Sequence, residues 1–272
     1  MTKTWTTRKM KHLALPLIVL AATTTMTRQA SADPPEPWMV IADKKVMSLD
    51  STKPGPVDAS IAKPHQGTPW VHVDGLLRGN PTSPEEQATK KSHNGAAPRL
   101  IFVTTPSEYL AQFSIRFIGS EKSGDTGRPL IDLGHHVCAL TLGGDKGAML
   151  TVNRHSLLVA QAESFKLEDG KTYHFQIEVK GPETLIRITD GPTLYATNEF
   201  LEGKKRTIGL AGAEQGTIEI DAFSIWSLKD GVQKGWSQRR DKLSAMKPVQ
   251  LKEPPAKKKR KKRSKTKKPG TL

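Results

Sequence analysis

Apolar side chains recur at every second position through much of this 272-residue chain. Successive side chains of a β-strand point to opposite faces, so such alternation indicates a strand that buries one face. The clearest case runs from 173 to 180. Its apolar members are Tyr173, Phe175, Ile177 and Val179, and its polar members are His174, Gln176, Glu178 and Lys180. We therefore expect a strand here with one core face and one solvent face.

Segments of this kind follow one another from residue 38 to residue 228, and loops rich in Gly, Pro, Asp and Asn divide them. The predicted strands cover 38–43, 70–79, 99–105, 109–118, 129–134, 136–143, 148–153, 157–163, 173–180, 184–190, 193–198, 206–212 and 217–228. Only the stretch 235–246 fits a helix, and a short one. Many short strands without helices between them are typical of antiparallel sheets. The sequence predicts an all-β fold, a two-sheet antiparallel jelly-roll sandwich.

The last predicted strand, 217–228, changes its pattern halfway along. Ile218 and Ile220 share one parity, whereas Phe223 and Ile225 share the other. One extra residue in a strand returns the side chains that follow it to the original face. We therefore expect a β-bulge near 221–222.

The formal charge of +15 is carried by the two ends of the chain. Ten of the 42 Lys and Arg residues lie in 256–272 and five lie in 1–32, and neither stretch contains an acid. The 27 basic residues that remain are balanced by 27 Asp and Glu residues, so the stretch 33–255 is formally neutral. A domain that grips a phosphate backbone usually carries surplus Lys and Arg on its own surface. The charge distribution therefore argues against a nucleic-acid-binding body.

The first 32 residues have the layout of a secretory signal peptide. Basic residues precede an apolar run at 13–22, and Ala-Ser-Ala follows at 30–32. This layout predicts cleavage near Ala32 and export to the periplasm or the extracellular space. An uncleaved membrane anchor is the alternative, although a spanning helix needs roughly 20 apolar residues and this run is about half as long. Either Met1 or Met10 is the start.

The basic tail, 256–272, is predicted to be disordered because it has too few apolar residues to bury. Its basic residues are Lys257, Lys258, Lys259, Arg260, Lys261, Lys262, Arg263, Lys265, Lys267 and Lys268. The tail is either a solvated end or an adhesive for an anionic surface: lipid headgroups, acidic polysaccharide or nucleic acid. A nuclear signal would require that the chain is not exported. The predicted organisation is a signal peptide (1–32), a sandwich (33–230), a short helix and linker (231–255) and this tail.

A family resemblance begins at Leu167. The segments "LEDGKTYHFQIEVKGPETLIRITDGPTLYAT" and "KKRTIGLAGAEQGTIEIDAFSIWSL" give an order of strands and Gly-containing turns. This order resembles the C-terminal half of the concanavalin A-like lectin/glucanase superfamily, nearest its 3-keto-disaccharide hydrolase and laminin-G-like members. "PWVHVDGLLRG" and "YLAQFSIRFI" are similar to the early strands of the same family. The resemblance spans about 36 to 228 and implies a concanavalin A-like fold.

The resemblance also implies hydrolase activity as an alternative function. Bound calcium is common in the superfamily. Glycosidases need two carboxyl groups that flank the bond they cleave. Laminarinase-like relatives carry these carboxyl groups on one strand as Glu-x-Asp-x-Glu. This chain matches only the first two positions, Glu219 and Asp221, and has Phe223 at the third. Where relatives alternate acids and amides, this chain reads "SGDTGRPLIDLGHHVCALTLGG". Glu219 and Asp221 are therefore weak catalytic candidates.

Sugar binding needs aromatic faces that stack on pyranose rings and planar polar groups that hold hydroxyls. Residues of these kinds on predicted polar faces or strand edges are Trp70, His72, Gln112, Arg116 and His136. His135 and His136 are expected to point to opposite faces of a strand, which does not suit a shared metal ion. No metal motif or cofactor motif is present, so we expect no metal and no cofactor.

Two further features are predicted to be structural. Cys138 is the only cysteine, and its apolar surroundings in "HHVCALTL" predict a buried thiol. The segment "GGDKG" at 143–147 lies between two predicted strands and is expected to be a hairpin turn.

These observations together predict an exported β-sandwich that binds carbohydrate or another cell-surface polymer without catalysis. The tail is expected to add adhesion to an anionic surface. The alternative is a glycoside or 3-keto-disaccharide hydrolase. A nucleic-acid-binding protein acting through the tail is the third option.

Overall fold

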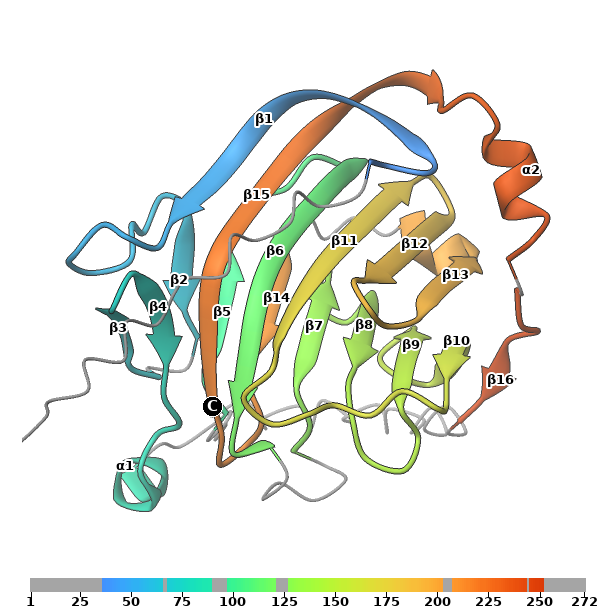
Figure 1. Ribbon diagram of the computed structural model, residues 1–272. Coiled ribbons are helices and arrows are strands. Elements are labelled where there is room, and N and C mark those ends of the chain that lie inside the picture. The colour runs from blue at the N-terminus through green and yellow to red at the C-terminus, as the bar shows by residue number, and fades with distance from the viewer. Residues whose placement is uncertain are drawn as a thin grey trace, which may run out of the picture. The chain divides into compact units, whose positions relative to one another are not determined.

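A computed structural model describes residues 36–65, 68–89, 97–120, 127–202, 207–243 and 245–251, which belong to one compact unit. The predicted signal peptide and the predicted basic tail lie outside the described residues. The described chain forms two antiparallel sheets of eight strands each, which pack face to face (Figure 1). The all-β sandwich predicted from alternation is confirmed.

Sheet A has the order β13-β12-β11-β6-β15-β4-β3, and β1 also pairs with β15. Its strands are β1 (Val40–Asp50), β3 (Trp70–Val73), β4 (Leu76–Gly79), β6 (Tyr109–Ile118), β11 (Thr172–Lys180), β12 (Glu183–Ile188), β13 (Thr193–Thr197) and β15 (Thr217–Val232). The long strands of this sheet curve across the sandwich (Figure 1).

Sheet B has the order β16-β10-β9-β8-β7-β14-β5-β2. Its strands are β2 (Ala62–Pro64), β5 (Arg99–Phe102), β7 (Leu130–Leu133), β8 (Cys138–Thr141), β9 (Ala148–Val152), β10 (Leu157–Ala162), β14 (Ile208–Ala211) and β16 (Val249–Gln250). Three short helices complete the described chain: α1 (Pro84–Thr89), the 3₁₀ helix η2 (Glu199–Glu202) and α2 (Trp236–Arg240).

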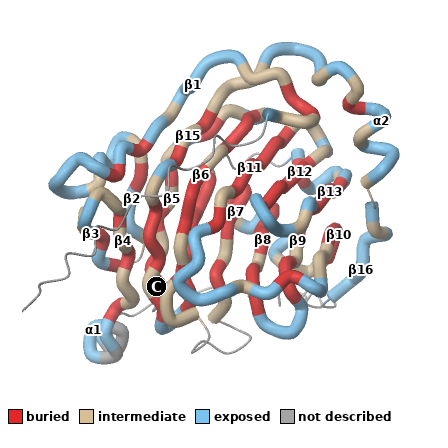
Figure 2. Tube along the Cα trace, in the orientation of Figure 1, coloured by how far each residue is buried: buried red, intermediate tan, exposed pale blue. Residues whose placement is uncertain are grey.

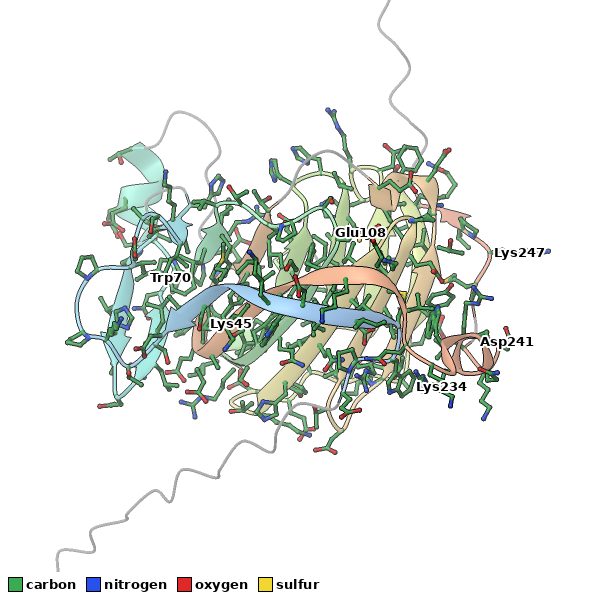
Figure 3. All side chains as sticks on the ribbon, turned by 90° about the horizontal axis from the view of Figure 1, so that it is seen from above. Lys45, Trp70, Glu108, Lys234, Asp241 and Lys247 are labelled. Carbon is green, nitrogen blue, oxygen red and sulfur yellow. The ribbon has the colours of Figure 1, made fainter. Side chains whose placement is uncertain are left out.

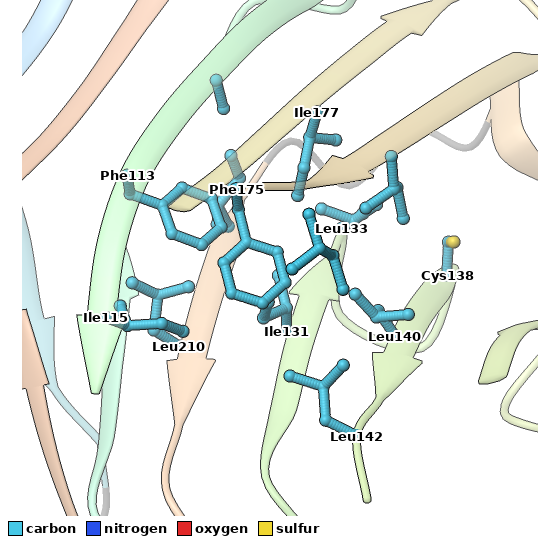
Figure 4. Packing of buried hydrophobic residues seen from close by; sticks show 14 of the residues in the cluster. Phe113, Ile115, Ile131, Leu133, Cys138, Leu140, Leu142, Phe175, Ile177 and Leu210 are labelled. Carbon is cyan, nitrogen blue, oxygen red and sulfur yellow. The ribbon is translucent and has the colours of Figure 1, made fainter. Parts of the chain in front are cut away.

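The core lies between the sheets and is built from the apolar side chains that alternate along each strand (Figure 4). The ring centroids of Phe102 and Phe223 lie 3.5 Å apart, and Phe113 stacks on Phe175 at 5.2 Å. Burying large aromatic side chains from both sheets supplies much of the stabilisation of such a fold. Buried residues follow the central strands, whereas exposed residues gather in the loops (Figure 2).

The predicted bulge in β15 is confirmed. The pairing of β15 with β6 shifts register between Ile220 and Ala222. Ile218 and Ile220 on one side of the shift and Phe223 and Ile225 on the other are all buried in the same core. One extra residue therefore turns a change of parity into a single apolar face.

Three local predictions need correction. The stretch 70–79 is a hairpin rather than one strand, because Asp74 (φ 52°) and Gly75 (φ 74°) form a left-handed turn between β3 and β4. The helix α1 was missed, although Ser83 and Glu86 exchange the two hydrogen bonds of a capping box. The chain after residue 230 takes part in the sandwich, since β15 runs to Val232 and β16 pairs with β10. The short helix predicted in 235–246 is confirmed as α2.

A buried carboxylate fastens the start of the described chain to the outward face of sheet A. Glu178 is fully buried and accepts hydrogen bonds from the backbone N–H groups of Trp38, Met39 and Val40 at 2.9, 2.6 and 3.1 Å. The Arg187 guanidinium lies over the Trp38 ring at 4.7 Å. This segment covers a second apolar cluster that includes Trp236 of α2. Part of the outward face of sheet A is thus closed by the chain itself.

Candidate functional site

Two of the predicted ligand-binding residues are engaged inside the fold. Trp70 is buried, and its indole ring packs so close to Gly79 that a Cβ there would lie 2.6 Å from the ring. Its Nε1–H donates to Thr68 Oγ1 at 3.2 Å. His72 is half-buried, with Nδ1 2.8 Å from the Ser51 carbonyl oxygen. The Trp70 ring is thus used for packing, at the β3–β4 side of the sandwich (Figure 3).

The structure places Gln112 and Arg116 on the outward face of sheet A, away from Trp70. The Gln112 amide donates to Gln176 Oε1 at 2.9 Å. Arg116 Nε donates to Glu219 Oε2 at 2.6 Å, and Arg78 Nε donates to Glu219 Oε1 at 2.7 Å. Both Glu219 oxygens are therefore ion-paired, which leaves this weak catalytic candidate without a free oxygen for acid or nucleophilic chemistry.

Asp221, the second weak catalytic candidate, lies at the bulge of β15. Its backbone carbonyl oxygen accepts a hydrogen bond from Ser51 Oγ. The bulge shifts register between Ile220 and Ala222, so it breaks the regular alternation that would place Asp221 beside Glu219 on one face.

His136 lines a cleft at one end of the sandwich, which we call the end cleft. This cleft of about 420 Å³ is lined by His136, Val137, Asn153, Arg154, Glu199, Phe200 and Glu202. It joins the β7–β8 turn, the β9–β10 turn and η2. His135 and His136 do not lie on a strand as expected. They lie in the β7–β8 turn, and their ring centroids are 3.8 Å apart.

Left-handed backbone conformations are concentrated at the end cleft. His136 has a φ of 66°, and the consecutive residues Asn153, Arg154 and His155 have φ values of 51°, 56° and 62°. Such conformations are uncommon for residues other than glycine and persist only where the surroundings hold them. Two hydrogen bonds hold them here, from Asn153 N–H to the Val137 carbonyl at 3.1 Å and from Arg154 N–H to the His136 carbonyl at 3.1 Å. The two turns therefore form one connected wall.

The opposite wall of the end cleft is the helix η2. Leu201 is buried and anchors it, and the Asn198 side chain accepts a hydrogen bond from Phe200 N–H at 3.0 Å. Phe200 is 40% exposed, and Glu199 and Glu202 on either side of it are exposed as well. An exposed aromatic ring beside planar polar groups provides the two kinds of contact that a sugar uses.

Sequence reasoning missed a buried ion pair close to this cleft. Asp132 is buried on the outward face of sheet B and forms a salt bridge with Arg99. Its Oδ2 atom lies 3.8 Å from Nδ1 of His135, and the His135 ring in turn contacts the tilted ring of His136. Burial lowers the pKa of Arg99, although a guanidinium remains protonated in proteins. The signal available in the sequence was an acid inside the apolar strand "LIDL", because a buried charge requires a partner.

The interior near the end cleft has no reactive thiol. Cys138 is buried in the core, as predicted, and burial raises the pKa of its thiol well above the usual range. The segment 143–147 connects β8 and β9 as the predicted hairpin turn.

Within the described parts of the chain, no three His, Cys, Asp or Glu side chains come together in a group that could hold a metal ion. Over the same residues, no helix is long and apolar enough to cross a membrane. The calcium that the family resemblance implies stays a prediction.

The sandwich has the concanavalin A-like jelly-roll fold. No family model matches the chain, and no curated protein matches it. One similar solved structure is a mutant of SCLam, a non-specific endo-beta-1,3(4)-glucanase from family GH16, co-crystallized with 1,3-beta-D-cellobiosyl-cellobiose. It has a TM-score of 0.50 and 10% identity, and the match covers 71% of this chain and 98% of that one.

Two other solved structures are similar at lower TM-scores. LamA from Z. galactanivorans, in complex with laminaritriose and laminaritetraose, has a TM-score of 0.44 at 11% identity, over 68% of this chain and 100% of that one. A Lotus tetragonolobus seed lectin has a TM-score of 0.42 at 11% identity, with the same coverage. Identities this low establish the fold alone, and the narrower resemblance to 3-keto-disaccharide hydrolases stays a prediction.

Proposed function

We propose that this protein is an exported β-sandwich that binds carbohydrate at the end cleft without cleaving it. The observation that carries the proposal is the position of Phe200. Its exposed ring stands in the end cleft together with the imidazole, amide, guanidinium and carboxylate groups of His136, Asn153, Arg154, Glu199 and Glu202. The fold supports the proposal, because SCLam, which shares it, was crystallised with a glucan oligosaccharide.

The rigidity of the cleft wall favours binding. The left-handed turns at His136 and at 153–155 are held to each other by backbone hydrogen bonds. A wall that is already ordered loses little conformational entropy when a ligand binds. A flexible sugar gains most from such a preorganised partner.

The arrangement of carboxylates disfavours hydrolysis at the end cleft. Glu199 and Glu202 are both exposed to solvent, whereas a general acid usually lies in a water-excluded pocket that keeps it protonated. Asp132 is paired with Arg99, and Glu219 is paired with two arginines on the other sheet. Inverting and retaining glycosidases alike need one carboxyl group that can give up a proton.

Export and adhesion complete the proposal and rest on the sequence. A signal peptide cleaved near Ala32 would deliver the sandwich to the cell envelope or beyond. The ten basic residues of 256–272 would then hold it against an anionic surface. Binding of sugar by the sandwich and adhesion by the tail would be separable activities.

A glycan array tests the proposal directly. The chain from Asp33 to Pro255, without the tail, should bind a restricted set of neutral oligosaccharides, and Phe200→Ala should weaken each of them. Incubation of the bound sugars with excess protein should release no new reducing ends. Absence of any glycan binding would reject the proposal, and release of shorter sugars would favour the hydrolase alternative.

A further inference from the structure

Three charged residues form a row across sheet A at the end of β6 away from the end cleft. The pairing registers place Arg78 of β4 and Arg116 of β6 directly opposite Glu219 of β15, one on each side. Tyr109, the first residue of β6, lies beside the β7–β8 turn. Arg116 follows seven residues later, roughly 23 Å further along an extended strand. We call these three residues the arginine row.

The buried carboxylate fixes both guanidinium groups. Glu219 is 1% exposed, whereas the side chains of Arg78 and Arg116 are 34% and 36% exposed. Each arginine contacts its own Glu219 oxygen through both Nε and Nη2. This geometry holds the two guanidinium planes in place, and Glu219 is the one partner of both among the residues that the structure describes.

The arginine row has one positive charge in excess. One guanidinium neutralises Glu219, so the second is surplus within the row. The neighbours that continue it are Val71 on β3 and Thr172 on β11, which are both exposed and uncharged. Guanidinium groups stay protonated at every physiological pH, so the excess charge is permanent.

We propose that Arg78 and Arg116 form a binding site for an acidic polysaccharide. Their strands lie on either side of β15, roughly 9.6 Å apart between backbones, and their guanidinium groups converge on the two oxygens of Glu219 between them. The exposed edges of the two guanidinium groups therefore lie close together, and an extended chain that carries carboxylate or sulfate groups can contact both. A planar guanidinium pairs with a carboxylate or sulfate more specifically than a lysine does. The site is separate from the end cleft and does not depend on it.

The small exposed apolar area beside the arginine row favours a polymer over a lipid headgroup. Val71, the neighbour of Arg78 on β3, is exposed and apolar, and a lone valine cannot insert into a bilayer to any depth. Its exposed methyl groups can instead contact the apolar face of a sugar ring. An extended glycan crossing β3, β4, β15 and β6 would use both kinds of contact.

The test follows the Nε–Hε resonances of Arg78 and Arg116 by ¹⁵N NMR on the full chain. The acidic probe is a hyaluronan hexasaccharide. Its uncharged control is the same sugar with methyl-esterified carboxylates. Both resonances should shift and saturate with the acidic sugar, at a concentration at least tenfold below that needed with inorganic sulfate. Site-specific resonances keep the reading independent of sugar bound by the tail.

Variants complete the test. Arg78→Gln and Arg116→Gln each leave one arginine to neutralise Glu219, so both variants should fold. In each, the affinity for the acidic sugar, read from the resonance of the remaining arginine, should fall at least tenfold. Arg116→Lys keeps the positive charge but loses the planar guanidinium group, and should lower the affinity nearly as much. Lys63→Gln removes an exposed charge from sheet B and should change nothing. Resonances that do not move, that respond equally to the esterified sugar, or that respond only to phosphatidylglycerol vesicles would overturn the proposal.

Discussion

The imidazole rings of His135 and His136 lie against each other in the β7–β8 turn, with centroids 3.8 Å apart and planes tilted by 39°, and this contact links two groups of polar side chains. On one side, His135 approaches the buried carboxylate of Asp132. On the other side, His136 lines the end cleft. The buried Arg99–Asp132 pair is therefore connected, through His135, to the wall of the end cleft that His136 forms.

Replacing the exposed ring in this cleft should weaken sugar binding without unfolding the protein. Phe200→Ala removes an aromatic face worth about 1 kcal/mol, which corresponds to a roughly fivefold loss of affinity. Because Phe200 is 40% exposed, the melting temperature should fall much less than it would on loss of a core aromatic ring. Val232→Ala removes a side chain of similar exposure on β15 and should leave affinity unchanged. Equal effects of the two substitutions would remove Phe200 from the site.

The buried carboxylate of Glu178 should be important for stability. Glu178→Ala deprives three backbone N–H groups and Arg187 of a partner, and loss of one member of a buried pair costs about 3–5 kcal/mol. Urea unfolding should report this loss as a lower midpoint. The matched control is Glu168→Gln, which breaks the exposed pair with Lys171 and should cost less than about 1 kcal/mol. Similar costs for both would mean that the start of the chain is not held as described.

Alkaline pH should destabilise the fold through the buried thiol of Cys138 and the phenol of Tyr195. Burial raises the pKa of Cys138, and burial together with Glu183 raises the pKa of Tyr195. The unfolded chain releases these protons at lower pH than the folded chain does, from about pH 8.5 for the thiol and about pH 10 for the phenol. The stability that they contribute is therefore complete at neutral pH and declines as the pH rises past those values.

Cys138→Ala separates the contribution of the thiol to this pH dependence. The variant should lose less stability between pH 7 and pH 9.5 than the parent chain, as measured by urea unfolding at each pH. Folded parent protein should also resist thiol reagents, because the thiolate is the reactive form. Rapid labelling of Cys138 under native conditions would contradict the buried position.

The tail should dominate binding to polyanions. The chain ending at Pro255 is expected to leave heparin at low salt, whereas the full chain with ten further basic residues should need much more. Elution of both chains at the same salt concentration would refute the division of charge between body and tail.

Alternation in the sequence was sufficient to predict most strands. The stretch 109–118 matches β6 residue for residue, and a parity change alone located the bulge of β15. A strand is a local pattern, since each side chain's face follows from its position. The same logic missed α1 because its signal lies in the cap, Ser83 and Glu86, and not in any apolar period.

The end cleft could not be read from the sequence in the same way. His136, Asn153 and Phe200 come from turns that are far apart along the chain, and the folded sandwich alone brings them together. The left-handed conformations at Asn153 and Arg154 are held by hydrogen bonds to the β7–β8 turn, which the sequence does not reveal. Only His136 was predicted, from its residue type. Trp70, the best stacking candidate by residue type, packs against Gly79 instead.

Calorimetric titration of the chain from Asp33 to Pro255 with its strongest array ligand, followed by analysis of the recovered sugar, is the most direct test of binding without cleavage. We expect saturable binding at one site, a several-fold weaker titration for Phe200→Ala, and recovery of the oligosaccharide at its original length. Shorter products, or a titration that Phe200→Ala leaves unaltered, would contradict the proposed function.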